Sequence, residues 1–274
     1  MKKAFYVFLG TILAGCMLAS CSQGPLFTPL DSSESGSSET FSLSSMVSEE
    51  SMLSSEISEE PEEDPYLGEP VPESDPVDES YFDDAVFIGD SLTYGLGAYQ
   101  VLDADKVIAH TGINPQTILT SECIEQPDGS SVTVLEAVEA AAPKKVYIML
   151  GSNGVAFLNQ SDIIKFYGEF IDELQAALPD AIFYVESVLP VTHEKETEDD
   201  RYSNSKINAL NEALQEMAAS QEVYYLDVSE AIKDENGCLP ADVSADGMHF
   251  GVSTYETWVD YLLSHTVDET LLPD

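Results

Sequence analysis

The sequence predicts an α/β fold, namely a three-layer α/β/α sandwich around a five-stranded parallel sheet. From Tyr81 onward, short apolar runs alternate with amphipathic stretches, as strands alternate with helices in this class. The runs show no strict polar alternation, which is typical of parallel strands that helices cover on both faces. Right-handed crossovers then bring the carboxyl ends of the strands to one edge of the sheet, where ligands of such folds bind.

Five strands and three helices can be assigned from these patterns. The expected strands are residues 85–88, 106–109, 145–150, 181–185 and 222–226. One helix starts at Ser161 as its N-cap, has one apolar face and stops before Pro179. A second helix contains the apolar stripe of residues 207–217, and a last one covers residues 254–263. We expect the aromatic side chains of the last helix in the core and not around a ligand.

Residues 1–20 have the pattern of an export signal, with a basic start followed by an apolar stretch. This stretch is shorter than the roughly 20 residues of a membrane-spanning helix, which favours a cleaved signal. The alternative interpretation is an uncleaved membrane helix. Small residues before Cys16 and before Cys21 resemble the bacterial lipobox. Cys21 is the expected lipidation site because it leaves the longer apolar stretch, and Cys16 is the alternative. The protein is therefore expected to be exported and lipid-anchored at the outer face of the bacterial cell membrane.

Residues 21–80 are rich in Ser, Glu, Asp and Pro. We expect this segment to be disordered, because it offers too little apolar surface to offset the loss of chain entropy on folding. It is interpreted as a tether between the lipid anchor and a folded domain, and the alternative is a merely solvated tail. Residues 81–274 then form the single folded domain.

The charge balance excludes nucleic acid as a partner. The chain has 51 acidic and 10 basic residues, a formal net charge of −41. Binding to a phosphate backbone requires clustered Lys and Arg, which this sequence lacks. Anionic lipid headgroups are repelled for the same reason, so membrane contact is expected through the lipid anchor only. No obligate protein partner is inferred.

The cysteines and one histidine are residues of types that can bind metals. Four cysteines are too few and too scattered for a disulfide scaffold or a zinc knuckle. Cys123 and Cys238 are expected to be buried free thiols, with a disulfide between them as the alternative. His193-Glu194 begins like a zinc-protease motif, but Thr197 stands in the place of the second histidine. His193 is expected to be a solvated loop residue, or to lie at the rim of the pocket.

Three segments that follow predicted strands carry residues suited to acyl-transfer chemistry. Gly89-Asp90-Ser91-Leu92 follows the first strand. A serine there would start a helix, where unpaired N–H groups and the helix dipole favour a developing negative charge. Gly112 and Asn153 follow the next two strands, and could direct an N–H and an amide donor to the same point. The alternatives are that Asp90, Ser91 and Asn153 only cap helices.

Near the end of the chain, Asp246-Gly247-Met248-His249 places a carboxylate and an imidazole in one loop. This spacing lets Asp246 fold back onto His249 and fix its tautomer, so that the other ring nitrogen faces a serine. An ordinary surface turn is the alternative. Each motif is weak alone, but their order and their positions after strands indicate one site.

With these motifs, the chain resembles the SGNH hydrolases, the GDSL esterase/lipase family, over roughly residues 82–265. The resemblance implies the SGNH, flavodoxin-like form of the α/β/α sandwich. It implies Ser91 as the nucleophile, His249 as the general base and Asp246 as the acid that orients it. The N–H groups of Ser91 and Gly112 and the amide of Asn153 would form the oxyanion hole.

The activity implied by this resemblance is that of a serine esterase. Such an enzyme hydrolyses O-acyl esters, here short-chain or acetyl esters of a small molecule or glycan, through a covalent acyl-serine intermediate. The family needs no metal and no organic cofactor. Two alternatives stay open, namely an O-acetyltransferase of the same fold and a non-catalytic glycan-binding lipoprotein. The sequence departs from the family at Gly154, where an Asp often follows the asparagine, and this raises the question of how the loop is held.

Overall fold

The computed structural model describes residues 64–267, and its main sheet is parallel and five-stranded. The strands are β1 (Ala85–Gly89), β2 (Val107–Ala109), β5 (Lys145–Met149), β6 (Ile182–Glu186) and β7 (Tyr224–Leu226). They pair in the order β2-β1-β5-β6-β7, all in parallel. Each strand overlaps its predicted range, and the predicted fold class is confirmed.

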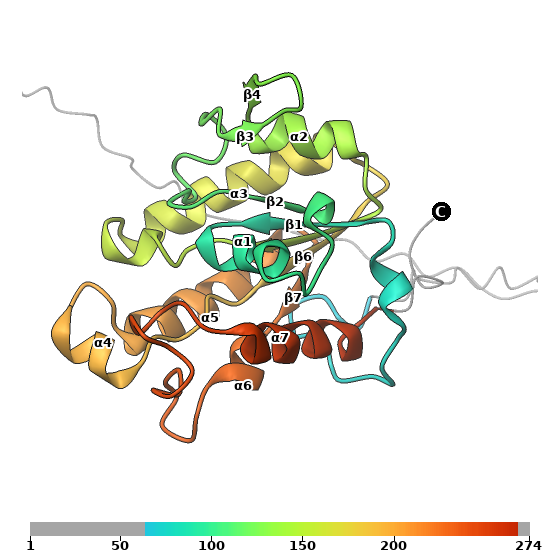
Figure 1. Ribbon diagram of the computed structural model, residues 1–274. Coiled ribbons are helices and arrows are strands. Elements are labelled where there is room, and N and C mark those ends of the chain that lie inside the picture. Colours follow the sequence, from blue (N-terminus) through green and yellow to red (C-terminus); the bar gives the residue numbers. More distant parts are fainter. Residues whose placement is uncertain (1–63, 268–274) are drawn as a thin grey trace, which may run out of the picture. The chain divides into compact units, whose positions relative to one another are not determined.

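Helices cover both faces of this sheet. They are α1 (Ser91–Ala98), α2 (Val134–Ala141), α3 (Gln160–Ala177), α4 (His193–Glu198), α5 (Asn204–Ser220), α6 (Ser229–Ile232) and α7 (Val252–Ser264). Apolar residues of α2, α3 and α5 form a core with one face of the sheet, and those of α1, α6 and α7 form a core with the other. Figure 1 shows α2 and α3 on one side of the strands and α6 and α7 on the opposite side.

Burial on both faces explains why the strand sequences are largely apolar. In β1, Val86 and Ile88 belong to the first core, while Phe87 belongs to the second. On the second face the rings of Phe87, Tyr147 and Tyr184, from three neighbouring strands, stack with centroid separations of 4.9 and 4.6 Å. Such aromatic pairs contribute about 0.5–1.5 kcal/mol each beyond the area they bury. The stacked rings therefore join β1, β5 and β6 on this face of the sheet.

The helix boundaries differ from the predicted ones. The long helix α3 begins at Gln160, and its N-cap is Asn159, whose side chain accepts from the Asp162 N–H at 2.9 Å. The predicted N-cap, Ser161, was wrong, because its hydroxyl instead donates to the Asn159 side chain at 2.6 Å. The last helix starts at Val252, earlier than predicted. The hairpin of β3 (Ile124–Glu125) and β4 (Ser131–Val132) was not predicted.

Part of the segment expected to be a disordered linker packs on the folded domain. Residues 64–80 run beside β7 and α7, where the Val71 N–H donates to the Tyr225 carbonyl at 2.9 Å. The Val77 N–H donates to the Leu263 carbonyl at 2.9 Å, and the Val71 side chain is buried. A few backbone bonds and one buried valine thus order a stretch whose composition is mostly acidic. The folded part begins before Tyr81.

The predicted signal peptide and the two candidate lipidation sites, Cys16 and Cys21, lie outside the described residues. Within residues 64–267, none of the helices combines the length and the apolar character needed to cross a bilayer. In the same range, Cys123 and Cys238 are free thiols, the first half-buried and the second buried, as the favoured interpretation expected.

A buried carboxyl at the end of β6 should make stability depend on pH. The Glu186 carboxyl accepts from the Trp258 indole N–H at 2.6 Å and is 2% exposed. Burial raises its pKa from its usual value of 4.5 to about 8, against the opposing effect of the indole hydrogen bond. Between these pH values the unfolded chain has lost this proton and the folded chain still holds it, so stability falls as the pH rises.

We therefore expect Glu186→Gln, which keeps an acceptor for Trp258, to abolish this pH dependence. Relative to the wild type, the variant should gain on the order of 5 kcal/mol in unfolding free energy between pH 4.5 and pH 8. Urea unfolding of both proteins across this range measures the gain. Parallel pH profiles for the two proteins would contradict the assigned shift.

Candidate active site

The first site residue stands where β1 passes into α1. Asp90 is the N-cap of α1, and its Oδ1 accepts from the Leu92 N–H at 3.0 Å. Ser91 is the first residue of the helix, so its N–H is one of the groups without an intrahelical acceptor. The capping role weighed for Asp90 is thus real, and it leaves the Ser91 side chain free for another partner.

The Ser91 side chain meets His249, from the far end of the sequence. Ser91 Oγ and His249 Nε2 are 2.9 Å apart, and His249 Nδ1 lies 2.7 Å from Asp246 Oδ2. The predicted Ser, His and Asp are therefore brought together in one chain of hydrogen bonds. The His249 and Asp246 side chains are 49% and 57% exposed, so this chain lies open to solvent.

The turn from Asp246 to His249 is ordered by its own carboxylate. Asp246 Oδ1 accepts from the Met248 N–H at 3.0 Å and from the His249 N–H at 2.9 Å. Burial acts to raise the pKa of Asp246, but the hydrogen bonds from the side chain and backbone of His249 outweigh it and hold the pKa well below its usual value. The carboxylate is therefore ionised at neutral pH, which strengthens a hydrogen bond from the imidazole N–H.

The N-terminal end of helix α4 packs against this turn. The Thr192 N–H donates to the Gly247 carbonyl at 2.9 Å, directly before α4 begins. Gly247 has a φ of +84°, and a Cβ at this position would lie 2.5 Å from the Cβ of Lys195. Only glycine combines this backbone conformation with such a close approach to the helix.

The two other predicted oxyanion donors, the Gly112 N–H and the Asn153 amide, differ in their hydrogen-bond partners. Gly112 is exposed with a φ of +86°, and within residues 64–267 its N–H has no hydrogen-bond acceptor. Asn153 occupies the N-cap position of a short 3-10 helix (Gly154–Ala156), but its side chain makes no capping bond. Its Nδ2 instead donates to Asp90 Oδ2 at 3.3 Å and to the Ile113 carbonyl at 3.1 Å. A substrate oxygen would have to share one of these two hydrogens.

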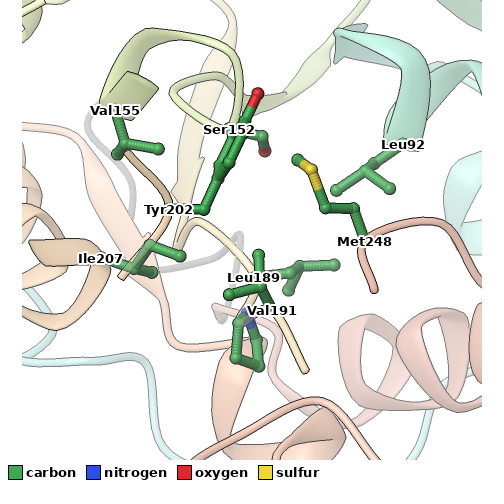
Figure 2. Close-up of a pocket in the computed structure, with 9 residues that line it drawn as sticks. Leu92, Ser152, Val155, Leu189, Val191, Tyr202, Ile207 and Met248 are labelled. Atoms are coloured by element: carbon green, nitrogen blue, oxygen red, sulfur yellow. The ribbon is translucent and has the colours of Figure 1, made fainter. Parts of the chain in front are cut away.

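A small cavity lies beside these residues, and a larger cavity shares one lining residue with it. The smaller one, of about 10 Å³, is lined by the neighbours of the site residues in sequence, including Leu92, Ser152 and Met248. Figure 2 shows Leu92 and Met248 on one side of it and Val155 on the other, with Tyr202 between them. The larger cavity, of about 370 Å³, lies between the first turns of α3 and α5. Val155 lines both cavities.

Comparison with known proteins shows the family of this chain. The sequence profile of the GDSL-like Lipase/Acylhydrolase family matches residues 87–257, a range that includes all five predicted site residues. This chain belongs to that family. The family resemblance inferred from the motifs is confirmed. Curated protein sequences give no significant match.

Solved structures share the fold of this GDSL-like chain. A protein from Streptococcus pneumonia, provisionally named a platelet activating factor, is 21% identical with a TM-score of 0.52, and the match covers 65% of this chain and 81% of that one. A provisionally assigned acylhydrolase from Bacteroides fragilis NCTC 9343 is 18% identical with a TM-score of 0.51, with coverages of 74% and 92%. Both likenesses concern the fold.

At Gly154, where the sequence was expected to depart from the family pattern, packing holds the loop. A Cβ on Gly154 would lie 3.2 Å from Ile163 Cδ1 of α3, so a larger residue would require the Ile163 side chain to move. The Leu158 N–H donates back to the Gly154 carbonyl at 2.8 Å. The loop that carries Asn153 is therefore fixed by its close contact with α3.

Asp90 is a further residue of this site, and the sequence predicts for it only the role of a helix cap. Asp90 is fully buried and joins α1 to the Asn153 amide. Burial raises its pKa to about 6, although hydrogen bonds from Leu92, Ser152 and Asn153 and the charge of His249 act against the rise. The contact joins residues 63 positions apart, which no local sequence pattern indicates.

Proposed function

We propose that this acylhydrolase is a serine esterase that removes short acyl groups, acetyl foremost, from exposed hydroxyls of a bulky alcohol such as a glycan. The observation that carries the proposal is the line of contacts from Ser91 Oγ to His249 Nε2 at 2.9 Å and from His249 Nδ1 to Asp246 Oδ2 at 2.7 Å. A serine beside an imidazole that a carboxylate orients is the arrangement that activates a hydroxyl nucleophile.

In the proposed mechanism, His249 accepts the proton of Ser91 as Oγ attacks the ester carbonyl. The N–H groups of Ser91 and Gly112 and the Asn153 amide donate to the oxyanion of the tetrahedral intermediate. The alcohol leaves with the proton from His249, and an acyl-serine remains. Water, deprotonated by His249, then attacks the acyl-serine and releases the carboxylic acid, which restores the Ser91 hydroxyl.

The two cavities support the choice of substrate. The small cavity beside Leu92 and Met248 has room for about one water-sized group, which suits an acetyl methyl and not a long chain. The larger cavity is lined partly by polar side chains such as Asn159, Gln160 and Lys206, which suit hydroxyl-rich ligands. His249 is half-exposed, so a pendant ester on a large molecule can reach it.

The proposed location rests on the sequence alone. Residues 1–20 have the pattern of an export signal, and Cys21 is the proposed lipid attachment site. The enzyme would then act at the outer face of the bacterial cell membrane, where the acidic residues after Cys21 separate it from the lipid. Cell-surface glycans are substrates within reach of such a domain.

A fluorophosphonate probe and a series of p-nitrophenyl esters test this function. We expect the probe to label Ser91, and kcat/KM to fall from acetate to octanoate. Tyr202→Ala should open the small cavity and raise the butyrate-to-acetate ratio of kcat/KM by about tenfold. Tyr99→Ala is the control, because Tyr99 lies at the other end of α1 from Ser91.

The alternatives give different results in the same experiments. An unlabelled Ser91 together with no ester turnover would favour a non-catalytic glycan-binding protein. Transfer of acetyl to an added sugar acceptor, in place of release as acetate, would identify an O-acetyltransferase. A preference for octanoate would contradict the short-chain proposal.

A further inference from the structure

Away from the candidate active site, three side chains of the types that bind transition metals converge. His193 and Glu196 lie three residues apart on α4, and therefore on one face of it. Cys238 comes from the segment between α6 and α7. One ligand atom from each of the three residues, a ring nitrogen, a carboxylate oxygen and Sγ, lie within 4.8 Å of one another. His193 is exposed, Glu196 is half-buried and Cys238 is buried.

The segment that carries Cys238 is held in place by its own hydrogen bonds. Asp234 Oδ1 accepts from the Asn236 N–H at 2.8 Å and from the Cys238 N–H at 3.0 Å. The Leu239 N–H donates to the carbonyl of Val191, shortly before α4, at 3.1 Å. The thiol therefore faces α4 because the backbone places it there.

A single buried amide, that of Asn204, lies close to two of the three groups. Asn204 Nδ2 lies 3.3 Å from Cys238 Sγ and 3.4 Å from Glu196 Oε2. The Asn204 N–H also donates to Glu196 Oε1 at 3.2 Å. Outer hydrogen-bond partners that contact the ligand atoms in this way are typical of metal sites.

We propose that His193, Glu196 and Cys238 bind a zinc ion, with water as the fourth ligand. Zinc accepts nitrogen, oxygen and sulfur ligands in one tetrahedral site, whereas calcium and magnesium take oxygen ligands. With zinc–ligand distances of about 2.0–2.3 Å, tetrahedral ligand atoms lie roughly 3.3–3.8 Å apart. The ligand atoms must therefore come closer together by about 1 Å. Rotation of the exposed His193 and half-buried Glu196 side chains would allow this movement. Binding releases the Cys238 thiol proton to solvent.

The place of this site in the fold gives the ion a structural role. It would join α4 to the segment of Cys238, and the N-terminus of α4 holds the turn of Asp246 and His249 through the Thr192–Gly247 hydrogen bond. The ion would thus stiffen the support of that turn without contacting the ester. This role is independent of the proposed esterase function.

Zinc titration of the reduced, chelator-treated protein tests the proposal. At a hundredfold excess of free zinc over Kd, the Tm should rise by about 5 °C or more. Cobalt(II), bound in place of zinc, should show the charge-transfer absorption of a thiolate ligand. Calcium should leave the Tm unchanged, which separates this site from general cation binding by an acidic protein.

Matched variants locate the site. His193→Ala and Cys238→Ala should each weaken zinc binding by at least about 100-fold. His110→Ala, at another exposed histidine, and Cys123→Ala, at the other described cysteine, should bind zinc like the wild type. Because His193 is exposed, its variant remains informative even if Cys238→Ala does not fold. The proposal fails if the wild type shows no zinc-specific shift, or if His193→Ala retains the wild-type affinity.

Discussion

Replacement of Ser91 by alanine should lower kcat for p-nitrophenyl acetate by about 10⁶-fold, because water must then attack the ester directly. The substitution removes Oγ, and with it the 2.9 Å contact to His249 Nε2, while the backbone N–H at the start of α1 remains. The fold should not change, because neither the Asp90 cap of α1 nor the sheet uses this hydroxyl. Initial rates and thermal unfolding, measured on the same preparation, check both expectations.

The matched control for this variant is Ser220→Ala. Ser220 is exposed, ends α5, and donates to the Met217 carbonyl, so the variant loses a serine hydroxyl far along the chain from the site residues. It should retain wild-type kcat. Wild-type turnover by Ser91→Ala would exclude Ser91 as the nucleophile, whereas equal losses in both variants would indicate a general effect of the substitutions.

Replacement of Asp246 by asparagine should lower kcat by about 10⁴-fold. The asparagine oxygen can still accept from the backbone N–H groups of Met248 and His249, so the turn should persist. Its amide nitrogen, however, would donate to His249 Nδ1, which puts the ring proton on Nε2. The imidazole could then no longer accept the proton of Ser91.

The measurement is kcat at a fixed pH, together with Tm. Asp128→Asn serves as the control, because Asp128 also accepts from a backbone N–H in an exposed turn, that of Ser130, and is outside the site. A loss below tenfold for Asp246→Asn, with an unchanged Tm, would show that His249 does not depend on this carboxylate.

The strands could be predicted from the sequence because burial on both faces leaves a simple pattern. Residues 85–88 and 145–150 are largely apolar, and the structure shifts their ends by one residue only. Helix ends were predicted less well, since two possible caps, Asn159 and Ser161, stand two positions apart and their own hydrogen bond decides between them. The missed helix α2 does have a local signal, the capping box of Thr133 and Glu136.

Within the site, residues with a chemical role in the family motifs were predictable, and contacts between distant segments were not. Ser91, Asp246 and His249 stood out because each has the right type of side chain next to a predicted strand or in a short turn. The contact of Asp90 with Asn153, and that of Cys238 with α4, depend on the tertiary fold. The packing of residues 64–80 could not be predicted, because a few scattered apolar residues among acidic ones give no pattern.

The base and its carboxylate lie on the same four-residue turn, and the serine lies on another element. A motion of this turn as a unit would therefore carry His249 and Asp246 together. Their mutual geometry would then be kept, and only the distance from His249 to Ser91 would change. The reactivity of the hydroxyl would then vary with one distance, that between Ser91 Oγ and His249 Nε2.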